Sequence, residues 1–134
     1  MKTNLRIGDR VSITKSFSAA EVKQFADMSA DNNPLHVDAE YARTTPFGRP
    51  IVHGMLVGSL FSGLLGERLP GKGTIYLGQH LKFLKPVFIG APVTATVEIT
   101  DIRPDKPIIT LKTVAVDASG ETVVDGEAVV KYPH

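Results

Sequence analysis

One segment constrains the fold of this chain more than any other, because residues 52–69 are apolar nearly all round a helical wheel and every fourth residue is small. The small positions are Gly54, Gly58, Ser62 and Gly66. This pattern predicts a helix that is covered on most of its faces. The stripe of small residues would let the helix lie close against a sheet or another backbone. A glycine in a helix costs about 1 kcal/mol relative to alanine, so close contact has to offset that cost.

The rest of the chain predicts short helices and strands around this segment. Ser18 followed by Glu21 is the signature of a capping box, which predicts a helix over 19–29. Asp38 can cap a second short helix over 39–43. Alternation of polar and apolar side chains predicts strands over 10–17, 74–83, 93–102, 108–117 and 122–132. This order predicts one α+β domain over residues 1–134, with a curved antiparallel sheet wrapped around one long helix.

Composition excludes several classes of function. The 134 residues carry a formal net charge of +1, which does not favour a nucleic-acid partner. There is no cysteine, so disulfides, thiol catalysis and cysteine zinc sites are excluded. Residues 1–8 lack the apolar stretch of a secretory signal, and residues 51–66 are shorter than the ~20 residues of a membrane span. We therefore expect a cytoplasmic protein with no nucleic-acid or membrane partner.

Residues 31–38, with the sequence DNNPLHVD, are the first candidate for chemistry. Asp31 and His36 lie five residues apart on a proline-stiffened turn between two predicted helices. An acid and an imidazole held rigidly are the groups that acid–base catalysis needs. The alternative is that Asp31 and Asn33 only form an Asx-type turn. The spacing alone leaves both interpretations open.

The start of the long helix is the second candidate. A glycine such as Gly54 exposes its backbone N–H, and the first N–H groups of a helix lack partners and lie at its positive end. Such a donor can stabilise an oxyanion that forms on a carbonyl. The alternative is that Gly54 only permits close contact, like Gly58 and Gly66. Together, the two segments suit the addition or removal of water next to a thioester carbonyl.

These motifs resemble those of the MaoC-like hot-dog family. DNNPLHVD at 31–38 is similar to its hydratase-2 motif, IVHGM at 51–55 to its helix entry, and FLKPV at 83–87 to its following strand. The resemblance covers nearly the whole chain and is closest to short (R)-specific enoyl-CoA hydratases that feed β-oxidation intermediates into polyhydroxyalkanoate synthesis. Residues 90–93 (GAPV) depart from the family, which often has Gly-Asp before the valine; this could alter the rim of the site but not the chemistry.

The resemblance implies a role for each candidate residue. Asp31 and His36 would be the catalytic pair, the N–H of Gly54 would bind the thioester oxygen, and Ser62 would line the active site. The family fold implies a homodimer with acyl-CoA at the subunit interface. The acyl group would lie against helix and sheet, where Leu65 and Val130 are candidates for setting the depth of its pocket.

The remaining candidates have plainer explanations. We expect His53 to orient the start of the long helix, and His80 and His134 to be solvated. Lys72, Lys82 and Lys85 could meet coenzyme A phosphates, although scattered surface lysines are the commoner explanation. No His and carboxylate group shows metal-ligand spacing. We therefore expect no metal and no cofactor beyond the coenzyme A of the substrate.

Two other functions fit the same fold. A hot-dog thioesterase would share the acyl-CoA ligand, but such enzymes commonly carry a carboxylate on the long helix, and residues 51–66 contain none. A non-catalytic acyl-thioester binding module, or a subunit of a larger dehydratase, would need the acid–base pair to have no function. Release of free thiol would favour the thioesterase, and tight binding without turnover would favour the module.

Overall fold

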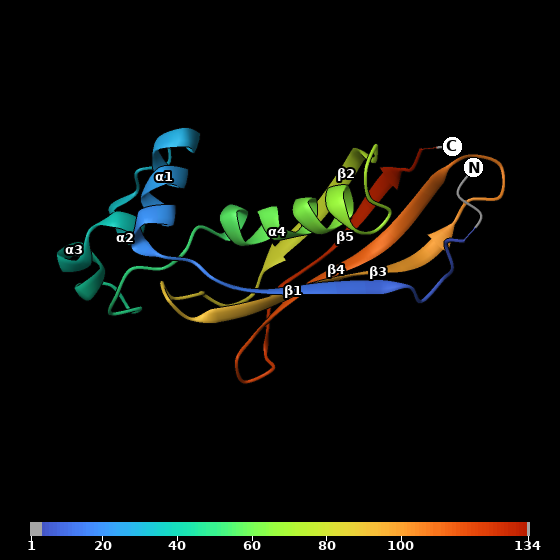
Figure 1. Cartoon of the computed structure of the whole chain (residues 1–134). Coiled ribbons are helices and arrows are strands. Elements are labelled where there is room, and N and C mark those ends of the chain that lie inside the picture. Colours follow the sequence, from blue (N-terminus) through green and yellow to red (C-terminus); the bar gives the residue numbers. More distant parts are fainter. Residues whose placement is uncertain (1–3, 134) are drawn as a thin grey trace.

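The computed structural model describes residues 4–133 and contains a five-stranded antiparallel sheet in the order β1-β3-β4-β5-β2. One long helix, α4, lies along one face of the sheet, and the shorter helices α1, α2 and α3 gather beyond one end of it (Figure 1). The elements are β1 Arg10–Ser16, α1 Ala19–Ser29, α2 Pro34–Val37, α3 Ala39–Arg43, α4 Gly54–Glu67, β2 Ile75–Phe83, β3 Pro92–Ile102, β4 Ile108–Asp117 and β5 Thr122–Lys131. The predicted α+β class is confirmed, and the curved sheet around α4 is the hot-dog arrangement that the resemblance implies.

The predicted caps are present at the two helices they were expected to start. Ser18 accepts a hydrogen bond from the Glu21 N–H, and the Glu21 side chain accepts one from the Ser18 N–H. Asp38 accepts from the N–H groups of Glu40 and Tyr41 at the start of α3. The one-turn helix α2 was not predicted from the sequence. Its signals were Asn33, whose side chain accepts from the Leu35 N–H, and Pro34 in the first turn.

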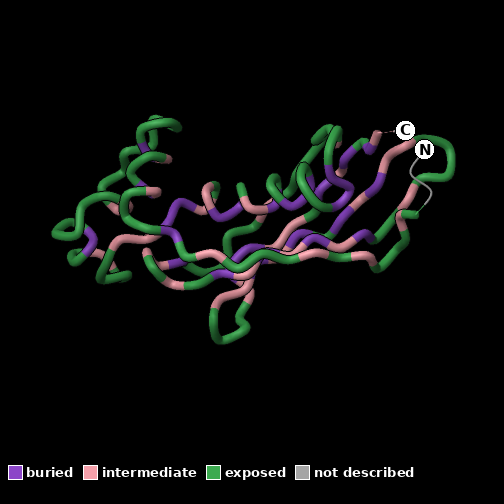
Figure 2. The backbone as a smooth tube through the Cα atoms, viewed as in Figure 1, coloured by how far each residue is buried: buried purple, intermediate pink, exposed green. Residues whose placement is uncertain are grey.

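The core lies between α4 and the inner face of the sheet. Alternate residues of β3 are fully covered there, and Figure 2 shows buried residues running along α4 and the strands beneath it, whereas α1 is largely exposed. The helix contributes Val57, Phe61, Leu64 and Leu65 to this core. Helix α4 is thus held by its buried side chains, and its N-terminus is fixed relative to the sheet.

The prediction that α4 is covered on most faces is wrong for this chain by itself. Met55 is 61% exposed, and Ser59, Ser62, Gly63 and Gly66 are exposed as well. The small-residue stripe also divides into two parts. A Cβ at Gly54 or Gly58 would contact Phe83 or Leu81 of β2, whereas a Cβ at Gly66 would meet open space. Only the first half of the stripe allows a close approach between helix and sheet.

Replacing Phe61 by alanine is expected to destabilise the protein by about 3–5 kcal/mol, because it leaves a cavity at a fully buried position of α4. Urea unfolding at one fixed protein concentration measures the change. Met28, which is 82% exposed, provides the matched control. Met28→Ala should stay within about 0.5 kcal/mol of the unchanged protein. Equal stability of the two variants would contradict the core described above.

Candidate active site

Asp31 is placed by the end of helix α1. The chain leaves α1 through Ala30, whose φ of 63° is left-handed and turns the backbone sharply. The Asp31 N–H then donates to Ser29 Oγ at 3.2 Å, and Asp31 Oδ1 accepts from the Asn33 N–H at 3.3 Å. The Asx-type turn considered as the alternative interpretation is therefore present. It leaves one carboxylate oxygen of Asp31 outside the turn, so the turn and a chemical role are compatible.

His36 is held in one tautomer by the backbone. It lies on α2, and its Nδ1 is 2.8 Å from the carbonyl oxygen of Ile51. A carbonyl can only accept a hydrogen bond, so Nδ1 carries the proton. In the neutral ring this leaves the lone pair on Nε2. That nitrogen is the one able to take a proton from a water molecule in the cavity.

The N-terminus of α4 lies against the same cavity. The Val52 N–H donates a hydrogen bond to the Val87 carbonyl oxygen at 2.7 Å. This bond connects the segment before α4 to the segment after β2. Gly54 is the first helical residue, and no described residue accepts a hydrogen bond from its N–H. A Cβ at Gly54 would lie 2.6 Å from Cδ1 of Phe83. Only glycine therefore fits at this position without displacing Phe83.

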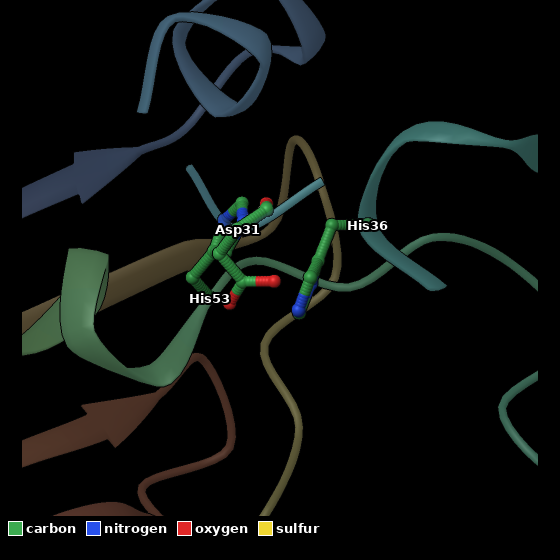
Figure 3. A group of neighbouring side chains, drawn as sticks. All are labelled: Asp31, His36 and His53. Atoms are coloured by element: carbon green, nitrogen blue, oxygen red, sulfur yellow. The ribbon is translucent and has the colours of Figure 1, made fainter. Parts of the chain in front are cut away.

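These groups share one cavity of about 470 Å³. Asp31, His36, His53 and Gly54 all line it, and its other walls are largely apolar, including Phe47, Phe83 and Val87. Figure 3 shows the Asp31 carboxylate directed toward the ring of His36, with His53 beside both. The cavity can hold a carbonyl compound between an acid–base pair and the positive end of a helix.

His53 belongs to this cluster, although its spacing in the sequence did not predict this. One ligand-type atom from each of Asp31, His36 and His53 lies within 4.8 Å of the others. The spacing along the chain hides this, because His53 follows Asp31 by 22 residues. A His and carboxylate group with metal-binding atoms therefore exists in space, although none shows in the sequence spacing. The absence of a metal stays a prediction.

Ser62 does not line the same cavity as Asp31. It lines a second cavity of about 460 Å³ between α4 and β2, together with Gly58, Tyr76 and Leu81. Met55 lines both cavities, so the two are neighbours. Burial raises the pKa of Tyr76, whose hydroxyl donates to the Gln79 side chain. The role predicted for Ser62 thus depends on a ligand that extends from the first cavity into the second.

Leu65 and Val130 lie in the closed core. Leu65 is 1% exposed and Val130 is 0% exposed, and neither lines either cavity. Their contact with an acyl chain stays a prediction.

The other candidates lie outside the cluster or at its rim. His80, Lys72 and Lys82 are exposed, and His134 lies outside the described residues. Lys85 lines the first cavity and forms an ion pair with Glu121. The departure from the family at residues 90–93 falls at the start of β3, and none of its residues lines either cavity.

Comparison with known proteins agrees with the fold. The chain belongs to the MaoC-like domain family, whose model matches residues 2–122. It is 58% identical to the (R)-specific enoyl-CoA hydratase of Aeromonas caviae, over 97% of each chain. It is 45% identical to the (R)-specific enoyl-CoA hydratase of Rhodospirillum rubrum, over 97% of this chain and 90% of that protein.

Two solved structures extend the comparison to three dimensions. The (R)-hydratase from A. caviae involved in PHA biosynthesis superposes with a TM-score of 0.97 over 98% of this chain and 99% of that one, at 58% identity. The R-hydratase PhaJ1 from Pseudomonas aeruginosa, in its unliganded form, gives a TM-score of 0.92 over 97% of this chain and 83% of that one, at 41% identity.

Proposed function

We propose that this chain is an (R)-specific enoyl-CoA hydratase, which adds water to trans-2-enoyl-CoA and forms (R)-3-hydroxyacyl-CoA. The observation that carries the proposal is the placement of the Asp31 carboxylate and the free Nε2 of His36 in one cavity with the N-terminus of α4. The A. caviae and R. rubrum relatives are both (R)-specific enoyl-CoA hydratases, which supports an enoyl-CoA substrate and an (R)-configured product. The A. caviae structure supports a role in supplying monomers for polyhydroxyalkanoate synthesis.

The proposed reaction uses Asp31, His36 and the Gly54 N–H to add one water molecule to the enoyl group. In this scheme a water molecule binds between the Asp31 carboxylate and His36 Nε2, and it loses a proton to this pair as its oxygen attacks the β-carbon. Electron density moves to the thioester oxygen, where the Gly54 N–H and the positive end of α4 stabilise the charge. The α-carbon then takes a proton from the Asp31–His36 pair, so the atoms of one water are added. No cofactor or metal takes part in this scheme.

A homodimer fits the surfaces that α4 and β2 leave open. Strand β2 is an edge of the sheet, and exposed apolar side chains lie on it and next to it: Ile75, Tyr76, Leu77, Phe83 and Leu84. The uncovered side of α4 flanks the second cavity, beside this edge. An apolar edge strand exposed to water would invite pairing with another chain. A second copy joined at β2 would cover the edge and could close the two cavities around a thioester.

We propose the cytoplasm as the location of this enzyme. As a separate finding, none of the helices in residues 4–133 has the length and apolarity that crossing a membrane requires.

Replacing Leu77 by lysine is expected to shift the protein from dimer to monomer, because it places a charge on the proposed β2 interface, where Leu77 is 52% exposed in the single chain. Analytical ultracentrifugation measures the mass in solution. Ile13→Lys is the matched control, since Ile13 is 40% exposed on β1, the opposite edge of the sheet. A wild-type protein that sediments as a monomer, or equal effects of the two variants, would contradict a dimer through β2.

The test of the proposed function separates it from the two alternatives. Crotonyl-CoA is mixed with the purified protein, the loss of enoyl absorbance is followed, and a thiol reagent detects free coenzyme A in parallel. The hydratase consumes the enoyl group and releases no thiol. Thiol release at the same rate would support a thioesterase instead. Such enzymes commonly carry a carboxylate on the long helix, whereas the only carboxylate of α4 is Glu67, its last residue. Binding without either reaction would support a non-catalytic module.

A further inference from the structure

His53 contacts both members of the acid–base pair. Its ring stacks on that of His36, with centroids 3.8 Å apart and planes inclined by 22°. Its Nε2 is 3.0 Å from the backbone carbonyl oxygen of Asp31. Phe25 of α1 also contacts the His53 ring, in a T-shaped arrangement with 4.8 Å between centroids. His53 is 2% exposed, so these contacts are almost entirely shielded from solvent.

His53 also directly precedes the proposed oxyanion donor. It is the N-cap residue of α4, yet its side chain makes no capping hydrogen bond. The backbone places Gly54 next in the chain. One side chain therefore contacts Asp31 and His36 while its own backbone leads into the helix terminus that carries the third group of the site.

One ring nitrogen of His53 makes the folded state less stable, because it is buried without a hydrogen-bond partner among the described residues. The Asp31 carbonyl can only accept, so the His53 Nε2 donates, and a neutral ring then has its lone pair on Nδ1. That Nδ1 is buried and has no hydrogen-bond partner among the described residues. A buried polar atom without a partner costs about 1–3 kcal/mol. An apolar ring could fill the same space without this cost but could not donate to Asp31.

We propose that His53 is a positioning residue of the reaction: it fixes the ring plane of His36 and the backbone of Asp31 relative to the N-terminus of α4. This inference rests on the proposed function, because it concerns the same site. The stack prevents the His36 ring from tilting about its hydrogen bond to Ile51. The bond to the Asp31 carbonyl holds the turn that carries the carboxylate. Both contacts act on groups that handle the water and neither needs contact with coenzyme A.

The expected kinetic signature follows from this geometry. A misplacement of about 1 Å in a catalytic group can lower the rate about 100-fold. His53→Ala removes both contacts and is expected to lower kcat by about that factor, with the KM for crotonyl-CoA nearly unchanged. His53→Gln keeps a donor that reaches Asp31 but loses the ring. His53→Phe keeps a ring against His36 but loses the donor. Each is expected to recover part of the lost kcat, and neither all of it.

The experiment compares these three variants with the unchanged protein and with Asp27→Asn, a control at an exposed residue of α1 that lines neither cavity. Thermal unfolding and circular dichroism confirm that each variant is folded. Intermediate kcat values for Gln and Phe at constant KM support the proposal. Wild-type kcat in His53→Phe would overturn it, because the ring alone would then suffice and the bond to Asp31 would have no role. Wild-type kcat in all three variants would overturn it as well.

A second readout does not depend on turnover. The ring-proton NMR signals of His36 are expected to shift in His53→Ala and His53→Gln, because the stacked ring is removed. They are expected to change little in Asp27→Asn. Unchanged His36 signals would overturn the inference. If the unchanged protein hydrates no enoyl thioester, the proposed function fails, and the His36 signals still decide whether the His53 ring contacts His36 in solution.

Discussion

Asp31→Asn is expected to lower kcat for hydration by about 100- to 10,000-fold, the usual contribution of a positioned acid–base group. The asparagine side chain keeps an oxygen that can accept from the Asn33 N–H, which Asp31 Oδ1 accepts at 3.3 Å. The turn is therefore preserved while the charge and the proton-transfer capacity are lost. Steady-state kinetics with crotonyl-CoA measures the effect.

His36→Asn tests the other half of the pair by the same reasoning. The asparagine amide can still donate to the Ile51 carbonyl oxygen, which His36 Nδ1 contacts at 2.8 Å. The variant loses the Nε2 lone pair, so a loss of similar size is expected.

Asp27→Asn is the matched control for both variants. Asp27 is an exposed carboxylate of α1 that pairs with Lys23 at 2.6 Å and lines neither cavity. Its kcat should equal that of the unchanged protein. Near-wild-type hydration in both Asp31→Asn and His36→Asn would rule out the proposed water activation.

Gly54→Pro is expected to lower kcat about 100- to 1000-fold below that of Gly54→Ala, which is the effect of removing one oxyanion donor. Proline has no N–H, and it is well tolerated at the first position of a helix. It also requires an extended residue before it, and His53 already has φ −56° and ψ 133°. The backbone can therefore accept proline without changing its path.

Comparison with the alanine variant separates the loss of the Gly54 N–H from the steric clash with Phe83. Both substitutions introduce a Cβ into the space beside Phe83, where the nearest ring carbon would be 2.6 Å away, so both should disturb that ring. Only proline removes the N–H. Comparing kcat for the two variants cancels the shared clash. Equal rates would mean that the Gly54 N–H does not stabilise the transition state.

Local signals in the sequence predicted the elements well. Helix α1 begins where the Ser18–Glu21 capping box places it and ends at Ser29, as predicted. Strand β4 spans Ile108–Asp117, the same residues that the alternation indicates. These elements depend on caps and on alternation, which short stretches of sequence contain. Helix α2 was missed because four residues are too few to show periodicity.

Contacts between distant segments were the part that the sequence could not show. The stack of His53 on His36 and its bond to Asp31 depend on how α4 enters the sheet, which no local spacing records. The same is true of Ser62, which lines the second cavity rather than the one with Asp31. Uniform apolarity in α4 also could not show which side would stay open. The apolar pattern predicted that most sides of α4 are buried, whereas in a single copy of the chain only the side that faces the sheet is buried.

The stereochemistry of the product tests the central claim most directly. Purified protein and the Asp31→Asn variant are each incubated with trans-2-enoyl-CoA. The 3-hydroxyacyl product of each reaction is then analysed on a chiral column. The account predicts the (R)-3-hydroxyacyl thioester from the unchanged protein and almost none from the variant in the same time. Formation of the (S) product, or equal formation of product by both proteins, would contradict it.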